Sequence, residues 1–262
     1  MAQLPLLPAG PLSAAVSRLL PEALPPPPDA AVFLGDLLDL RGGVSLADAL
    51  YTLPPPGGAL PSAEAAAALL VRVRDEGEAL VGRMEDAFVH AFRPRYRLPG
   101  PARAYTLLEQ SGAFAPKRSP RIAVAAARTL WAPYSDFLET HLKRAKFGLR
   151  DLRAELAPRL QALGPAAERL EKLESALSLS TMAETERLYR RSLHAVEQRF
   201  LEGLRAALKA LPKDVDPTVI EAWYAPTGFV SLVFEDGRKL VAAIFAHERA
   251  RLEALVHACA AG

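Results

Sequence analysis

The feature that most constrains the fold is a leucine-rich, highly charged stretch that covers residues 119–211. Its apolar residues recur every three or four positions, and Arg, Lys and Glu fill most of the positions between them. This spacing places the apolar side chains on one face of a helix, and that face has to be buried against another element. The stretch therefore predicts long amphipathic helices that pack on one another.

The composition also favours helices. Half of the 262 residues are hydrophobic, but only 7% are aromatic, and the apolar content is mainly Ala and Leu. These two residues lose little conformational freedom in a helix, whereas β-branched and aromatic residues favour strands. We therefore predict an all-α protein: an elongated helical bundle with long antiparallel helices and a smaller N-terminal helical region.

Proline and glycine divide the chain into five predicted segments. They are a Pro-rich N-terminal segment (1–28), an N-terminal helical region (29–92), a basic Pro-rich loop (93–121), a long helical hairpin (122–211) and a C-terminal segment with a helix (212–262). The loop could hold a short helix around 104–110. In the hairpin, Gly164-Pro165 predicts a stop and a restart, Pro133 predicts either a kink or the first turn of a new helix, and 178–181 predicts slack.

The segment 229–245 has two interpretations. An Asp-Gly pair lies between two apolar runs there, which is a strong signal for a β-hairpin. A helix is the favoured interpretation, because an isolated two-stranded hairpin is only marginally stable. In the helical region before residue 92, Gly77 and Gly82 each weaken a helix by up to about 1 kcal/mol relative to Ala, so packing has to offset them or the helix bends.

The charge balance makes nucleic acid an unlikely main partner. The chain has 32 Lys and Arg against 30 Asp and Glu, a net charge of +2, whereas nucleic-acid-binding domains usually carry a strong excess of cations. The loop 93–121 is a local exception, because Tyr96 and Tyr105 lie among its cations and could stack on bases. Nucleic-acid binding through this loop is therefore the alternative function. Its candidate residues are Arg93, Arg95, Arg97, Lys117 and Arg118.

The sequence contains no recognised motif for catalysis or cofactor binding. It lacks the Gly-rich phosphate loops and the G-x-S-x-G elbow, and its five histidines include no i, i+4 pair. The single cysteine, Cys259, excludes an internal disulfide and Cys-rich metal sites. We therefore predict a protein that is not an enzyme and has no cofactor or metal. A pocket that combined His141, His194 or His247 with a carboxylate would favour an enzyme instead.

The sequence predicts no transmembrane segment and a cytoplasmic location. No stretch approaches the roughly 18–20 uninterrupted apolar residues that a membrane helix needs. The N-terminus has prolines at positions 5, 8 and 11 and no charge before Arg18, whereas a secretory signal has a cationic start and an unbroken apolar run.

Protein binding is the function class that remains. A long amphipathic hairpin has two apolar faces, and a face that is not buried internally can pack on a second copy or on another protein. Further interaction candidates are Arg187, Arg190 and Arg191, which share a charged segment with Glu184 and Glu186. The spacing of Glu186 and Arg190 favours an i, i+4 ion pair.

Several leucine and charge motifs resemble an uncharacterised proteobacterial family, a domain of unknown function. They are Y-S-D-F (134–137), L-R-D-L-R-A-E-L (149–156), L-E-K-L-E-S-A-L (170–177), E-R-L (186–188) and E-Q-R-F (197–200), with a looser fit at 43–50 and from Trp223 onward. Genes of this family tend to lie beside inner-membrane proteins that resemble flagellar stator subunits and OmpA-like peptidoglycan binders. The resemblance implies a cytoplasmic accessory of a stator-like complex and no catalytic residues. The prediction is a non-enzymatic helical adaptor or scaffold that binds other proteins or itself.

Overall fold

The structure is a computed structural model that describes residues 63–93, 96, 98–115, 120–212 and 215–261, together with Ala47 and Tyr51. In these residues it has six helices and no strand, so the predicted all-α class is confirmed. The helices are α4 (Ala63–Val89), α5 (Pro101–Gln110), α6 (Pro120–Gln161), α7 (Pro165–Lys209), α8 (Pro217–Tyr224) and α9 (Phe229–Ala261). The predicted Pro-rich segment 1–28 lies outside the described residues.

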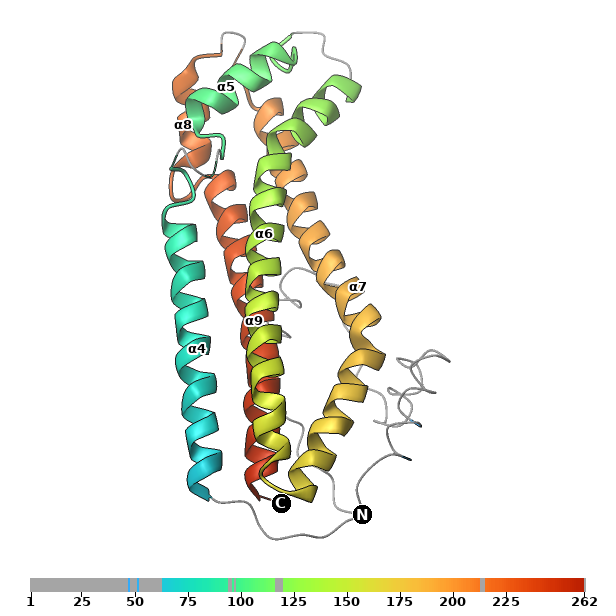
Figure 1. The fold of residues 1–262 in the computed structure, drawn as a ribbon. Coiled ribbons are helices and arrows are strands. Elements are labelled where there is room, and N and C mark those ends of the chain that lie inside the picture. Colours follow the sequence, from blue (N-terminus) through green and yellow to red (C-terminus); the bar gives the residue numbers. More distant parts are fainter. Residues whose placement is uncertain are drawn as a thin grey trace, which may run out of the picture.

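Four long helices form an elongated bundle (Figure 1). Helices α4 and α7 run in one direction, and α6 and α9 run in the other. Helices α6 and α9 each pack against the other three, whereas α4 and α7 lie on opposite sides of this central pair. The short helices α5 and α8 contact each other at the end of the bundle where α4 ends and α6 begins. None of the helices in the described part of the chain has a stretch that is long and apolar enough to cross a membrane.

The predicted long hairpin is present as α6 and α7. Helix α6 continues through Pro133 and Pro158, so Pro133 does not begin a new helix. The stop and restart occur at Gly164, whose φ of 138° is strained for any residue with a side chain, and Pro165 occupies the first turn of α7. The turn therefore has the residues that its backbone requires.

The segment 229–245 is helical, as the favoured interpretation predicted. It forms the first half of α9, and its buried residues recur at helical spacing: Val230, Val233, Phe234, Leu240, Val241 and Ile244. The glycine of the Asp-Gly pair serves packing and not a turn. A Cβ at Gly237 would lie 2.9 Å from both methyl carbons of Leu138 on α6, so glycine allows α6 and α9 to approach closely.

The interior has two apolar clusters. The first is rich in aromatic residues and joins all six helices around Phe88, Tyr134, Phe137, Phe200 and Phe234. The second is aliphatic and lies at the other end of the bundle, where α6 ends and α7 begins; its members include Leu69, Val73, Leu149, Leu152, Leu156, Leu252 and Val256. Helices α4, α6 and α9 contribute to both clusters, so each of them is packed toward both ends of the bundle.

The segment 93–121 contains more helix than its proline content suggests. Helix α5 begins at Pro101, three residues before the short helix that the sequence allowed there. It ends in a Schellman arrangement: Gly112 has a φ of 72°, its N–H donates to the Glu109 carbonyl, and the Ala113 N–H donates to the Leu108 carbonyl. The buried side chains of Ala104 and Leu108 fix this helix to the aromatic cluster.

Candidate functional site

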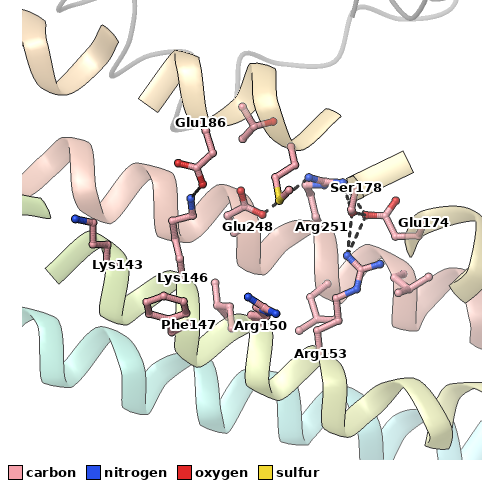
Figure 2. A pocket seen from close by; sticks show the side chains of 15 residues that line it. Lys143, Lys146, Phe147, Arg150, Arg153, Glu174, Ser178, Glu186, Glu248 and Arg251 are labelled. Atoms are coloured by element: carbon pink, nitrogen blue, oxygen red, sulfur yellow. Dashed lines mark hydrogen bonds and ion pairs between the residues drawn. The ribbon is translucent and has the colours of Figure 1, made fainter. Parts of the chain in front are cut away.

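A surface pocket of about 480 Å³ lies between α6, α7 and α9 (Figure 2). It lies where α7 bows away from α6 in the middle of the bundle (Figure 1). Near this bow, the hydroxyls of Ser180 and Thr181 donate to the carbonyls of Ala176 and Leu177. Such i−4 bonds often bend helices. The slack predicted at 178–181 is therefore a curved but unbroken part of α7.

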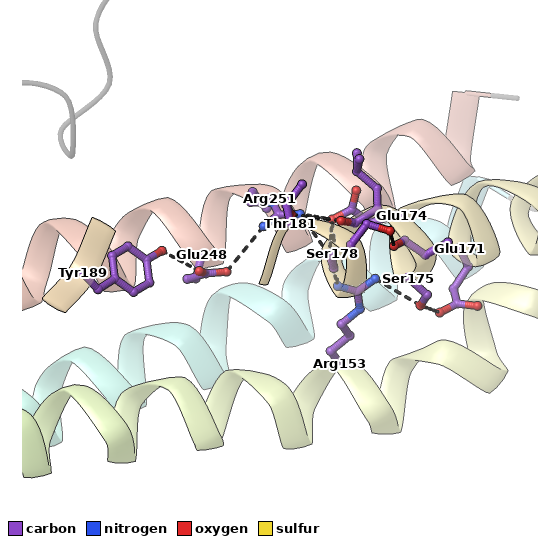
Figure 3. A network of polar contacts seen from close by, with 12 residues as sticks. Arg153, Glu171, Glu174, Ser175, Ser178, Thr181, Tyr189, Glu248 and Arg251 are labelled. Atoms are coloured by element: carbon purple, nitrogen blue, oxygen red, sulfur yellow. Dashed lines mark hydrogen bonds and ion pairs between the residues drawn. The ribbon is translucent and has the colours of Figure 1, made fainter. Parts of the chain in front are cut away.

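One wall of the pocket is a charged cluster centred on Ser178 (Figures 2 and 3). Arg153 of α6 and Arg251 of α9 both donate to the Ser178 hydroxyl oxygen, each at 2.9 Å. Arg251 also donates to Glu174 at 2.7 Å, and the Ser178 hydroxyl donates to the same carboxylate at 3.0 Å. Residues of three helices thus share one serine and one glutamate.

This cluster continues toward the α6–α7 turn through a buried carboxylate (Figure 3). Arg153 donates to the Ser175 hydroxyl at 3.2 Å, and Ser175 donates to Glu171 at 2.8 Å. Glu171 is only 5% exposed, and its second oxygen accepts a hydrogen bond from Gln161 at 2.8 Å. The bonds stabilise a charge that would be costly to bury alone.

Two further contacts between helices lie near the other end of the pocket. Lys146 of α6 pairs with Glu186 of α7, and the Tyr189 hydroxyl donates to Glu248 of α9 at 2.6 Å. Burial raises the pKa of Tyr189 above its ordinary value, and the charge of Glu248 adds to the shift. Burial lowers the pKa of Lys146, and Glu248 opposes that change. Tyr189 therefore remains a hydrogen-bond donor at neutral pH.

The cations of the pocket outnumber its carboxylates. The cations are Lys143, Lys146, Arg150, Arg153 and Arg251, and the carboxylates are Glu174, Glu186 and Glu248. Each carboxylate already binds a cation, and Lys143 pairs with Glu139 at 3.2 Å. Across the described ranges, Arg150 is the one cation of the pocket for which no ion pair or hydrogen bond is found.

Apart from Ser178 and Thr185, the rest of the lining is apolar. Leu149, Leu252 and Leu255 are buried and form the base of the pocket. Phe147 of α6 and Met182 of α7 also line it, yet they are 57% and 55% exposed. The pocket therefore combines a buried aliphatic base, an exposed apolar rim and a surplus of positive charge.

A second pocket of about 380 Å³ continues along α6 and α7 and shares Lys143, Lys146 and Glu186 with the first. It combines His194 with Glu197, the kind of pairing that would favour an enzyme. The two ring nitrogens of His194, however, lie 2.9 Å from Glu197 and 3.1 Å from Gln198, both on its own helix. Each nitrogen thus has a partner on its own helix.

The other two candidate histidines do not lie at the pockets. His141 is buried among the rings of Phe88, Tyr96 and Phe137 in the aromatic cluster. His247 is exposed on α9. Neither residue lines either pocket.

The cations predicted for the basic loop are largely outside the described residues. Arg93 is exposed, whereas Arg95, Arg97, Lys117 and Arg118 are among the residues that the structure does not describe. The two tyrosines of this loop are used in packing: Tyr96 meets the Phe137 ring at 5.2 Å and Tyr105 meets the Phe114 ring at 5.2 Å. Both rings are half-buried.

The predicted arginines of α7 are on the surface. Arg187, Arg190 and Arg191 are exposed, and Arg187 pairs with Glu184 at 2.7 Å. The spacing favoured a pair between Glu186 and Arg190, but Glu186 turns to Lys146 across the groove. A contact between helices therefore replaces the local one.

Sequence reasoning did not identify the α6/α7/α9 pocket. Ser178 lies 25 positions after Arg153 and 73 before Arg251, so no local pattern joins them. The available signal was the polar interruption of the α7 stripe at 178–181, which marks where α7 leaves the core.

Two further features of the described part concern metal binding and the single cysteine. No group of three or more His, Cys, Asp or Glu side chains in it is arranged to hold a metal ion. Cys259 is buried, its thiol lies 3.7 Å from the Ala167 carbonyl, and burial raises its pKa to about 11, so it stays protonated. No protein-family model, curated protein or solved structure matches this chain.

Proposed function

We propose that this protein is a non-enzymatic helical adaptor or scaffold, which acts by binding another protein. The observation that carries the proposal is the state of the carboxylates in the α6/α7/α9 pocket. Each of them is held by an arginine, lysine, tyrosine or serine, most of these from another helix. A general base has to be free to accept a proton from a substrate, whereas these groups join helices.

The surface of α7 supports protein binding. Within ten residues it exposes Leu179 at 61%, Met182 at 55% and Leu188 at 38%. The exposed Arg187, Arg190 and Arg191 lie in the same part of the helix. Apolar anchors beside arginines are typical of protein interfaces, where Arg and Met are enriched.

The resemblance to a family encoded beside stator-like proteins suggests the partner. We therefore propose a cytoplasmic accessory of a stator-like inner-membrane complex, in which α7 contacts the cytoplasmic part of a membrane subunit. If the protein has no such partner, we propose that it associates with itself through the exposed residues of α7.

Size-exclusion chromatography with light scattering tests the adaptor function. The protein is run alone and mixed with the products of its neighbouring genes. We expect a complex or an oligomer with the wild type, and its loss in a Leu179→Glu, Leu188→Glu double variant. A Val71→Glu, Val89→Glu variant is the matched control, because these residues are 54% and 74% exposed on α4, on the opposite side of the bundle. A protein that stays monomeric with every neighbour contradicts the proposal.

A further inference from the structure

We propose that the α6/α7/α9 pocket binds a small amphipathic anion, a molecule in which one carboxylate or phosphate head group is attached to an apolar chain. The inference goes beyond the adaptor function and does not rest on it. Leu179 and Leu188, the residues changed in the test of the adaptor function, do not line the pocket, although Met182 belongs to both surfaces.

The charge of the pocket selects an anion. Its five cations meet three carboxylates of the lining and a fourth, Glu139, beside Lys143, and each of these carboxylates is engaged by side chains of the protein. Arg150 remains without a partner within the described residues, and its planar guanidinium can bind both oxygens of a carboxylate or phosphate. A cationic molecule would instead be repelled by the surplus positive charge.

The lining of the pocket favours a ligand that has an apolar chain. Leu149, Leu252 and Leu255 provide a buried aliphatic base on which a hydrocarbon chain can pack. Phe147 and Met182 are more than half exposed at the rim, and a chain that covered them would remove apolar surface from water. Met182 can also adapt its shape to the ligand, because its side chain is unbranched and flexible.

The size and the outlet suit a single-chain molecule. The volume of about 480 Å³ lies within the roughly 300–1,000 Å³ of small-molecule sites. The second pocket begins at Lys143, Lys146 and Glu186, which both pockets share. A chain that is longer than the first pocket can therefore continue along the groove between α6 and α7.

The head group is assigned to Arg150 because the other arginines of the pocket are committed. Arg153 and Arg251 hold Ser178 and Glu174, and displacing them would break contacts between helices. Arg150 is exposed and lies one turn before Arg153 on α6, so it can accept an anion without such a loss. Removing its charge should therefore weaken ligand binding without unfolding the protein.

The test uses the full-length protein and a fluorescent fatty acid, 11-(dansylamino)undecanoic acid, below its critical micelle concentration. We expect saturable binding to the wild type and no change in the dissociation constant for Arg144→Gln. For Arg150→Gln the dissociation constant should be about tenfold higher, because roughly one charge-assisted contact is lost. Arg144 is the matched control, an exposed arginine of α6 that does not line the pocket. Circular dichroism verifies that both variants are folded.

Competition identifies the head group. Dodecanoate and dodecyl phosphate separate the carboxylate from the phosphate, and displacement by either one supports the proposal. Dodecanol and dodecyltrimethylammonium should displace the probe at least about tenfold less well. Non-saturable binding, equal loss in the two arginine variants, or equal displacement by the neutral and cationic competitors would overturn it. The Leu179→Glu, Leu188→Glu variant should still bind the probe, so failure of one proposal can be distinguished from failure of the other.

Discussion

Gly77, Gly82 and Gly237 all lie inside helices, but the structure gives them different surroundings. A Cβ at Gly77 would lie 2.5 Å from the Arg249 side chain, and one at Gly237 would meet Leu138 at 2.9 Å. Gly82 has no atom within 4 Å of the same position. A methyl group at residue 237 would therefore meet the buried Leu138, one at residue 77 would require the Arg249 side chain to move, and at residue 82 glycine only weakens α4.

The first prediction contrasts two of these glycines. Gly82→Ala should raise the free energy of unfolding by up to about 1 kcal/mol, because alanine favours the helix and meets nothing. Gly237→Ala should lower it by about 1–3 kcal/mol, because the added methyl group forces Leu138 and α6 to move. Urea titrations followed by far-UV circular dichroism measure both changes. If both substitutions changed the free energy of unfolding in the same direction, the close approach of α6 and α9 at Gly237 would be contradicted.

The glycines also show a limit of sequence reasoning at this scale. The sequence indicated that Gly77 and Gly82 weaken their helix and that packing has to offset them. The sequence could not show that Gly77 has a packing neighbour and Gly82 has none. The neighbour of Gly77 is Arg249, which lies more than 160 positions away in the chain. Arg150 and Arg153 present the same problem, since they are neighbours on α6 and only Arg153 meets the serines of α7.

Among the elements, α4 and α9 are linked by an ion pair of Arg238. Arg238 of α9 donates to both oxygens of Glu85 on α4 at 2.8 Å and to both oxygens of Glu235 at 2.7 Å. The hydrogen bonds from Arg238 hold the pKa of Glu235 below its ordinary value of 4.5, and partial burial opposes the shift. Because the folded pKa is the lower one, this stabilisation is complete above about pH 4.5 and is lost as the pH falls through the folded pKa.

The second prediction concerns Glu235 and follows from its lowered pKa. Glu235→Gln should lower the free energy of unfolding at pH 7 by less than about 1 kcal/mol, because the side chain is 40% exposed and solvent screens the pair. The difference from the wild type should shrink as the pH falls below 4.5. Urea midpoints at pH 7, 5, 4 and 3 measure it. Glu78→Gln, an exposed glutamate of α4, is the control, and a difference that grows in acid would contradict the assignment.

The elements that the sequence predicted are those with long apolar stripes. The α6–α7 hairpin and the helical form of 229–245 are confirmed, because their buried residues recur at helical spacing over many turns. Helix α8 has only eight residues and was not predicted. Its start carried a signal, since Asp216 caps the Thr218 N–H at 2.8 Å and Pro217 occupies the first turn.

For the molecule as a whole, the sequence indicated an elongated helical bundle but not its pocket. The bundle follows from long amphipathic helices, two of which, α6 and α7, are joined by a short turn, and the structure has this architecture. The pocket depends on where α7 separates from α6 and α9, which is decided by side chains of three helices at once. Such a cavity is a property of the assembled bundle, so periodicity within one helix could not reveal it.

The two apolar clusters raise the question of whether the bundle unfolds as one unit. Trp131 and Trp223 both belong to the aromatic cluster, so tryptophan fluorescence reports on that end alone. Leu156 is fully buried in the aliphatic cluster, 25 positions after Trp131 on the same helix. Since a helix rises about 1.5 Å per residue, the two sites are roughly 37 Å apart.

The third prediction uses this separation. Leu156→Ala should lower the free energy of unfolding by about 2–5 kcal/mol, because it leaves a cavity in the aliphatic cluster. If α4, α6 and α9 couple the clusters, urea midpoints from tryptophan fluorescence and from far-UV circular dichroism should fall together. A fluorescence midpoint that stays at the wild-type value would mean that the aromatic end unfolds independently.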